Sequence, residues 1–83
     1  MVIRGYVLIE ADVGKAQVVR DAIATISRSD GKVLTADTVT GPFDVIASLE
    51  AADLDTLGSF VTSAIQRLEG VQRTTTCLAV RLR

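Results

Sequence analysis

Few residues of this chain could do chemistry, and the most conspicuous is an acid beside a turn. Asp44 stands near the start of the apolar run 43–50 (FDVIASLE), three residues after Gly41 and two after Pro42. A carboxylate in that position can bind the ammonium group of a ligand through charge-assisted hydrogen bonds. It can equally brace the turn by accepting hydrogen bonds from backbone N–H groups, as Asp commonly does. The residue types leave both interpretations open.

Nucleophilic and metal chemistry find little support in the other residues. The chain has one cysteine and no histidine, so it lacks the ligand clusters of a zinc site and cannot form an intramolecular disulfide. We therefore expect no cofactor. Cys77 lies within an apolar stretch without an accompanying base, which favours a small core residue over a nucleophile. A single cysteine also fits a reducing cytoplasm.

The composition predicts one globular domain over residues 1–83. Hydrophobic residues make up 48% of the chain and aromatic residues only 4%, so its core must be aliphatic. The net charge of −1 lacks the positive excess of a nucleic-acid binder. The opening residues 1–13 are too short and too soon interrupted by charges for a signal peptide or a membrane span. We expect a cytoplasmic protein without nucleic-acid or membrane partners.

The spacing of apolar residues predicts the elements that position Asp44. Alternation with a period of two predicts strands over residues 2–11, 32–40, 43–50 and 71–83. Steps of three and four predict helices from Gly14 to about Arg28 and from an Asp53 cap to a left-handed Gly70 cap. Gly41 and Pro42 should join the second and third strands in a tight hairpin turn.

This βαββαβ order predicts an α+β, ferredoxin-like fold. Its four-stranded antiparallel sheet has the order 4-1-3-2, with both helices on one face. The first and third predicted strands carry apolar residues on both faces: Ile3, Val7, Ile9, Val45, Ala47 and Leu49 on one, and Val2, Tyr6, Leu8 and Ile46 on the other. Since a sheet with one wet face alternates more cleanly, we expect a homodimer through the open face. The alternative is a monomer whose Arg and Thr side chains shield a modest patch.

Several motifs occur together in an order that carries a family resemblance. They are Val39-Thr40-Gly41 followed by Asp44, the helix with Leu57, Phe60, Ile65 and Leu68, Gly70-Val71 before Thr74-Thr75-Thr76, and the opening stretch Tyr6 to Lys15. With them the chain resembles, over nearly its whole length, the effector-binding or RAM domain of the Lrp/AsnC (leucine-responsive regulator and asparagine regulator) family. Two features depart from that pattern: residues 27–34 (SRSDGKVL) are longer and more polar, and Pro42 replaces a polar residue.

The resemblance implies a small-molecule sensor, with an amino acid as its effector. It also implies a ring of dimers, with ligand pockets where dimers meet. The implied ligand-binding residues are Thr40, Gly41, Phe43, Asp44, Thr74 and Thr76. Asp44 would take the ammonium, Gly41 would permit close approach, and the threonines would offer hydroxyls. The alternative for the threonine run is ordinary β-branched strand residues.

Regulators of this family carry a helix-turn-helix before this domain, whereas the present chain begins directly at its first strand. We therefore expect a stand-alone module that does not itself read DNA but could pair with a full-length regulator.

Three other interpretations remain. A cluster of Arg4, Arg73, Arg81 and Arg83 could hold an anion or RNA, or form salt bridges between subunits. A small cofactor-independent enzyme could use the same dimeric fold, but such enzymes need residues for proton transfer. The chain has no His, Trp or Asn and only one Tyr, which disfavours catalysis. The third interpretation is a structural oligomerisation module without a ligand.

Overall fold

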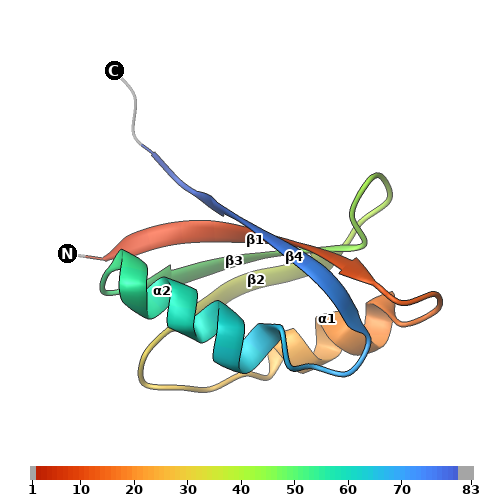
Figure 1. The fold of residues 1–83 in the computed structure, drawn as a ribbon, viewed down its shortest axis with the longest axis horizontal. Helices are drawn as coiled ribbons and strands as arrows, with labels where there is room; N and C mark the ends of the chain where they lie inside the picture. The colour runs from red at the N-terminus through yellow and green to blue at the C-terminus, as the bar shows by residue number, and fades with distance from the viewer. Residues whose placement is uncertain (1, 81–83) are drawn as a thin grey trace.

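The computed structural model describes residues 2–80 and forms a single four-stranded sheet flanked by helices. The elements in chain order are β1 (Ile3–Ala11), α1 (Ala16–Ala24), β2 (Lys32–Thr38), β3 (Val45–Ala51), α2 (Leu54–Phe60), η1 (Val61–Ile65) and β4 (Val71–Leu78). The strands lie in the order β2-β3-β1-β4 with antiparallel neighbours (Figure 1). The predicted ferredoxin-like fold and strand order are therefore confirmed.

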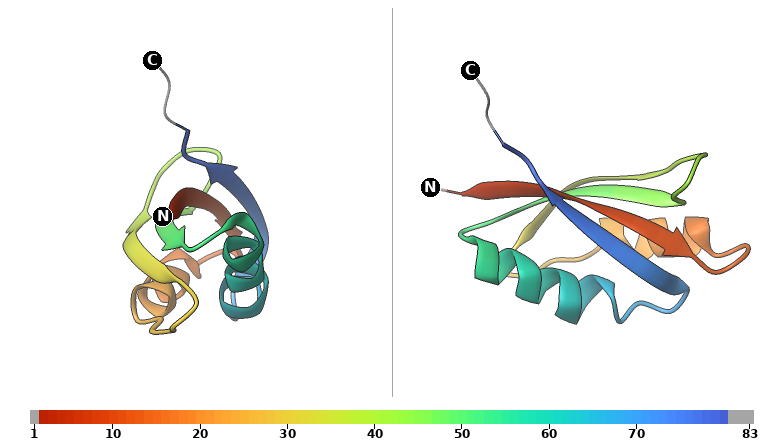
Figure 2. Two further views of the ribbon diagram at one scale, coloured as in Figure 1. Left: turned by 90° about the vertical axis from the view of Figure 1, so that its left-hand side faces the viewer. Right: turned by 45° about the horizontal axis from the view of Figure 1, so that its top comes forward.

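Both helices pack on the same face of the sheet, and the core lies between them and the strands (Figure 2). The register brings Val7 of β1 opposite Ala47 of β3, and directly opposed side chains point to the same face. The largest fully buried side chains are Val7, Ile9, Val19, Ile23, Val45, Leu49, Leu57, Phe60 and Ile65. Of the two faces that the alternation distinguishes, the buried one is therefore the face with Val7, Ile9, Val45, Ala47 and Leu49.

The opposite face of the sheet has no helix over it among residues 2–80. Its centre holds Leu8 opposite Ile46 on β3, and Tyr6 lies beside them with 39% of its surface exposed. Cys77 of β4 pairs with Tyr6 and is also exposed on this open face. The prediction that Cys77 is a core residue is wrong, because the alternation of β4 turns the side chains of Arg73, Thr75 and Cys77 away from the helices.

Asp53 caps the second helix as predicted. Its Oδ1 accepts a hydrogen bond of 2.8 Å from the Thr56 N–H. The hydrogen bonds from Thr56, of the side chain first and then of the backbone, lower the pKa of the Asp53 carboxyl. Regular helix ends at Ile65 rather than near Gly70, because α2 passes into the wider turn η1, where the Gln66 N–H bonds the Val61 carbonyl. Gly70 takes the expected positive φ of +96° just before β4.

The first helix ends at Ala24, earlier than predicted, because the following loop has its own contacts. The Arg28 guanidinium grips Asp30 with two hydrogen bonds of 2.9 and 2.7 Å and donates a third of 2.8 Å to the Ser63 hydroxyl. It also lies 5.5 Å from the centre of the Phe60 ring. These contacts attach residues 27–31 to α2 and η1.

The connection between β2 and β3 is not the tight turn predicted. β2 ends at Thr38 and β3 begins at Val45, so the loop is six residues long. It is closed by a hydrogen bond of 2.9 Å from the Val39 N–H to the Asp44 carbonyl. Gly41 has φ of +146°, which other residues rarely adopt, and so fits this loop without strain.

No helix within residues 2–80 is both long and apolar enough to cross a membrane.

Two glycines give a matched test of how the loop of residues 27–31 packs on Phe60. A Cβ on Gly31 would fall 2.9 Å from Cε2 and Cγ of the Phe60 ring, whereas a Cβ on Gly58 of α2 would meet nothing within 4 Å. We expect Gly31→Ala to lower the free energy of unfolding by about 1–3 kcal/mol through overpacking. We expect Gly58→Ala to raise it by up to about 1 kcal/mol, since Ala favours helix. Denaturant titrations of both variants measure this; equal stabilities would contradict the packing of residue 31 on Phe60.

Candidate functional site

Asp44 connects the β2–β3 loop to the end of β1. Its carboxylate Oδ2 accepts a hydrogen bond of 2.8 Å from the Ala11 N–H, and its own N–H donates one of 2.9 Å to the Ile9 carbonyl. Ile9 pairs with Val45, the first residue of β3. The pairing of β1 with β3 ends at that pair, so the carboxylate supplies the acceptor that a longer β3 would have provided.

The bracing interpretation of Asp44 therefore describes a contact that is present, with one difference. The side chain braces β1, which lies 33 residues away in the sequence, rather than the Gly41-Pro42 turn. Only Oδ2 is used: Oδ1 has no hydrogen-bond partner among the residues that the structure describes. Bracing thus leaves part of the carboxylate available, and the ligand contact of Asp44 stays a prediction.

The other predicted residues of the loop lie at its surface. Thr40 and Gly41 are exposed, and Phe43 is half-buried. Thr40 lines a hollow of 590 Å³ with Thr38 and Val39. A Cβ on Gly41 would meet nothing within 4 Å, so there is room for another molecule to approach the backbone here.

The predicted threonines lie on β4. Thr74 pairs with Ile9 and Thr76 with Val7, so both side chains point to the helix side of the sheet. The Thr74 Oγ1 accepts a hydrogen bond of 2.9 Å from Nε2 of Gln66. Thr74, Gln66 and Arg73 line a second hollow of 360 Å³.

Within one chain these residues form two separate groups, which we call half-sites, and not one cavity. Asp44 and its loop lie on one side of β1, and Thr74 and Thr76 lie on the other. Ile9 of β1 has Val45 on one side and Thr74 on the other. Since neighbouring strands lie about 4.8 Å apart, β1 separates the two half-sites by about 10 Å. One half-site carries the Asp44 carboxylate, and the other carries the Thr74 hydroxyl on the helix side of the sheet. Arg73 borders the same hollow, but its side chain turns to the other face and pairs with Glu10.

Sequence reasoning missed Gln66 and Arg73 as neighbours of Thr74. Gln66 is the first residue after η1, and its position follows from where the helical segment ends, which the sequence did not show. Arg73 was instead expected to cluster with Arg4, and that prediction is wrong. Arg73 pairs with Glu10, at 3.7 Å, whereas Arg4 lies six residues earlier on β1, about 20 Å away along the strand. Arg81 and Arg83 lie outside the described residues.

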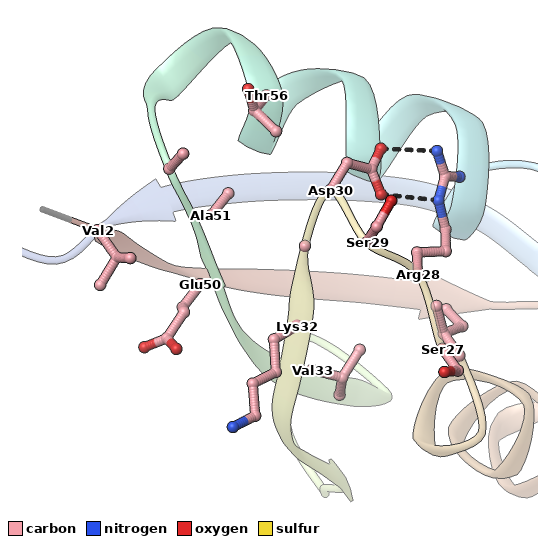
Figure 3. Close-up of a pocket in the computed structure, with 13 residues that line it drawn as sticks. Val2, Ser27, Arg28, Ser29, Asp30, Lys32, Val33, Glu50, Ala51 and Thr56 are labelled. Carbon is pink, nitrogen blue, oxygen red and sulfur yellow. Dashed lines mark hydrogen bonds and ion pairs between the residues drawn. The ribbon is translucent and has the colours of Figure 1, made fainter.

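A hollow of 610 Å³ was not predicted (Figure 3). It lies at the other end of the sheet, between the loop of residues 27–31, the start of β2 and the end of β3. Its charged lining residues are Arg28, Asp30, Lys32 and Glu50. The polar stretch 27–34 was the feature of the sequence that could have indicated it.

No three side chains from His, Cys, Asp and Glu gather as a metal site within residues 2–80.

The chain matches a known protein family. A family model described as the Lrp/AsnC ligand binding domain matches residues 4–82. No curated protein matches the chain.

Solved structures share the fold over nearly the whole chain. The protein TTHA0845 from Thermus thermophilus is 37% identical, with a TM-score of 0.83 over 98% of this chain and 96% of its own. E. coli AsnC is 15% identical, with a TM-score of 0.83 over 96% of this chain and 52% of its own. The transcriptional regulator NMB0573 from Neisseria meningitidis, solved as an L-Met complex, is 16% identical, with a TM-score of 0.79 over 95% of this chain and 50% of its own. At these two lower identities the likeness shows the fold alone.

The Asp44 brace predicts a graded effect of two substitutions on stability. Asp44→Ala removes the acceptor of the partly buried Ala11 N–H, so we expect unfolding to become easier by about 1–3 kcal/mol. Asp44→Asn keeps an acceptor oxygen in place and should cost clearly less. Thermal and denaturant unfolding measure both; equal losses in the two variants would show that the hydrogen bond to Ala11 does not hold the strand end.

Proposed function

The chain belongs to the Lrp/AsnC ligand-binding domain family, and from this membership we propose that it is a sensing and oligomerisation module whose effector is an amino acid. The observation that supports an amino acid is the pair of half-sites on either side of β1. One presents the Asp44 carboxylate and the other the Thr74 hydroxyl. An α-amino acid carries an ammonium, which a carboxylate can bind, and a carboxylate, to which a hydroxyl can donate.

The chemistry at each half-site follows from its unused hydrogen-bonding capacity. The Oδ1 oxygen of Asp44 has no partner within residues 2–80 and can accept from an ammonium. The Thr74 hydroxyl already accepts from Gln66, so its O–H can still donate to a carboxylate oxygen. Thr40, Gly41, Phe43 and Thr76 would border the ligand as this proposal places it.

One chain does not complete this site, because β1 lies between its halves. The proposal therefore needs a second copy, whose Asp44 loop would face the β4 threonines of the first. This is the arrangement expected when dimers join into a ring and the ligand binds at the junction. The L-methionine bound in the Neisseria regulator of the same fold supports an amino acid as the class of effector. A full-length regulator of the family could take the place of the second copy.

The dimer itself would form through the open face of the sheet. Tyr6, Leu8 and Ile46 form an apolar centre there, and hydroxyl side chains of Thr35, Ser48 and Thr75 surround it. The Thr35 and Ser48 hydroxyls already bond each other at 2.7 Å. A face with an apolar centre and satisfied polar groups at its edge is suited to burial against an identical face.

Catalysis has less support than sensing. The single tyrosine, Tyr6, lies on the open face and not at either half-site. The half-sites hold no histidine to move a proton, since the chain has none. A regulatory domain, not an enzyme, is therefore the function we propose, and the single cysteine supports a cytoplasmic location.

The test of sensing is thermal unfolding of the protein with each of the twenty amino acids. A ligand that binds only the folded state stabilises it by mass action, by about 2.7 kcal/mol at a hundred times its Kd. We expect one or a few amino acids to raise the melting temperature. For these, Asp44→Asn should weaken binding by about 1.5–3 kcal/mol in calorimetry, the value of a charge-assisted hydrogen bond. Asp55→Asn, at an exposed acid of α2, is the control. Unchanged affinity in Asp44→Asn would exclude Asp44 as a ligand contact, and a silent panel would contradict amino-acid sensing.

The dimer predicts that one added charge at the open face separates the subunits. Leu8→Asp places a carboxylate at the apolar centre, and its burial against a second copy would cost several kcal/mol. We expect light scattering to show a smaller species or an unfolded chain. The matched control is Val13→Asp, at a fully exposed position in the turn after β1. A wild-type protein that scatters as a monomer of 8.8 kDa would contradict the dimer.

A further inference from the structure

The sheet has two outer strands, β2 and β4, which lie at its opposite sides (Figure 2). An outer strand turns half of its backbone N–H and C=O groups away from the sheet, and these groups can pair with a strand of another chain. Proteins usually protect such edges, because uncontrolled pairing leads to aggregation. The two edges of this sheet differ in that protection.

The free edge of β2 is protected by a side chain of α1. The bond from the Val39 N–H to the Asp44 carbonyl sets the alternation along β2, so the backbone groups of Ala36 point away from β3. The outward carbonyl of Ala36 accepts a hydrogen bond of 2.9 Å from Nε of Arg20. The register of β2 is also irregular in its first half. Another strand could pair with this edge only if Arg20 first left Ala36.

The free edge of β4 has no such protection. The Ala79 N–H donates a hydrogen bond of 2.9 Å to the Arg4 carbonyl of β1, and this bond sets the alternation along β4. The backbone groups of Thr74, Thr76 and Leu78 therefore point away from β1. Within residues 2–80, no hydrogen bond from a side chain or a loop reaches these groups.

The residues of β4 suit a strand that pairs on both sides. β4 is eight residues long and has three consecutive threonines, which are β-branched and favour strands. It contains neither proline nor glycine, and Arg73 is its only charged residue. Charges, prolines and bulges are what normally prevent an edge from accepting another strand. The middle of β4 has none of them.

The protection of β2 determines which strand can occupy the β4 edge of another copy. Pairing of β4 with β2 would displace Arg20, and each added copy would leave a new edge for the next. Pairing of β4 with β4 uses the unprotected edge of both copies and stops at two, as an isologous contact does. In the antiparallel direction the threonines of the two strands lie near one another, which is favourable. The two Arg73 side chains then lie toward opposite ends of the paired strands.

We propose that the β4 strands of two copies pair with each other in the antiparallel direction and join the two sheets into one. The outward N–H and C=O groups of Thr74, Thr76 and Leu78 bond the same groups of the second copy. These bonds use the backbone, so the Thr74 and Thr76 side chains keep their place on the helix side of the sheet. The β4 edge is a different surface from the open face. The pairing goes beyond the proposed function and does not rest on it.

The experiment is amide hydrogen exchange of the unmodified protein, measured for each residue by NMR. In a single chain the N–H groups of Thr74, Thr76 and Leu78 face solvent and should exchange as fast as those of a loop. We expect them instead to exchange as slowly as the N–H of Thr75, which bonds β1. A sample mixed from isotopically labelled and unlabelled copies should show nuclear Overhauser effects between the β4 strands of two copies.

A proline at the edge tests the same contact by mutation. Thr76→Pro removes an N–H that points away from β1, and proline is tolerated at such positions of an outer strand. The matched control is Thr76→Val, which keeps the N–H and the shape of the side chain. We expect Thr76→Pro to lose the slow exchange at Thr74 and Leu78 and to sediment as a smaller species. Thr76→Val should assemble as the unmodified protein does.

The contrary results are distinct. Fast exchange of Thr74, Thr76 and Leu78 in the unmodified protein would overturn the pairing, even if Thr76→Pro failed to fold. Slow exchange without contacts between the β4 strands of two copies would also overturn it, because another element or another protein would then occupy the edge. A folded Thr76→Pro variant with the same size as Thr76→Val would contradict the pairing as well.

Discussion

Both helices of this chain pack on the same face of its sheet, and this one-sided packing constrains the rest of the molecule. The side chains of Val7, Ile9, Ala47 and Leu49 are buried because α1, α2 and η1 cover them. The same strands must then show their alternate residues, Tyr6, Leu8 and Ile46, on the uncovered side. A domain of 83 residues is near the size at which one core is only marginally stable. Association through the uncovered face would supply further burial, which is why assembly and stability are linked in the function that we propose.

β1 lies between β3 and β4, and this position determines where the groups of the candidate site lie. β1 has β3 on one side and β4 on the other, so groups on those two strands cannot meet within one chain. Asp44 extends the pairing of β1 beyond the start of β3 and so holds the loop of residues 39–44 against the strand. A carboxylate that stabilises the fold with one oxygen and leaves the other available can join folding to binding. In this account a ligand would bridge two copies of the chain, and binding would therefore favour their association.

The sequence was sufficient to predict the structure where the interactions that determine it are local or periodic. The alternation of residues 2–11 and 43–50 divided the side chains into two faces, and the Asp53 cap followed from a bond that spans three residues. It was insufficient where a contact joins distant residues. The tight turn was wrong because Asp44 bonds Ala11, 33 residues away, and α1 was predicted too long because Arg28 bonds Ser63, 35 residues away. The separation of Thr40 and Asp44 from Thr74 by β1 required the sheet order and the register together. The ligand-binding roles of these residues stay predictions.

The most direct test of the account is native mass spectrometry of the unmodified protein, alone and with a mixture of the amino acids. The account predicts assemblies with even multiples of the 8.8 kDa chain, because the open face pairs copies of it. It also predicts that these assemblies retain the added mass of an amino acid and grow larger when it binds. A protein that remains at 8.8 kDa, or an assembly that never retains an amino acid, would contradict it.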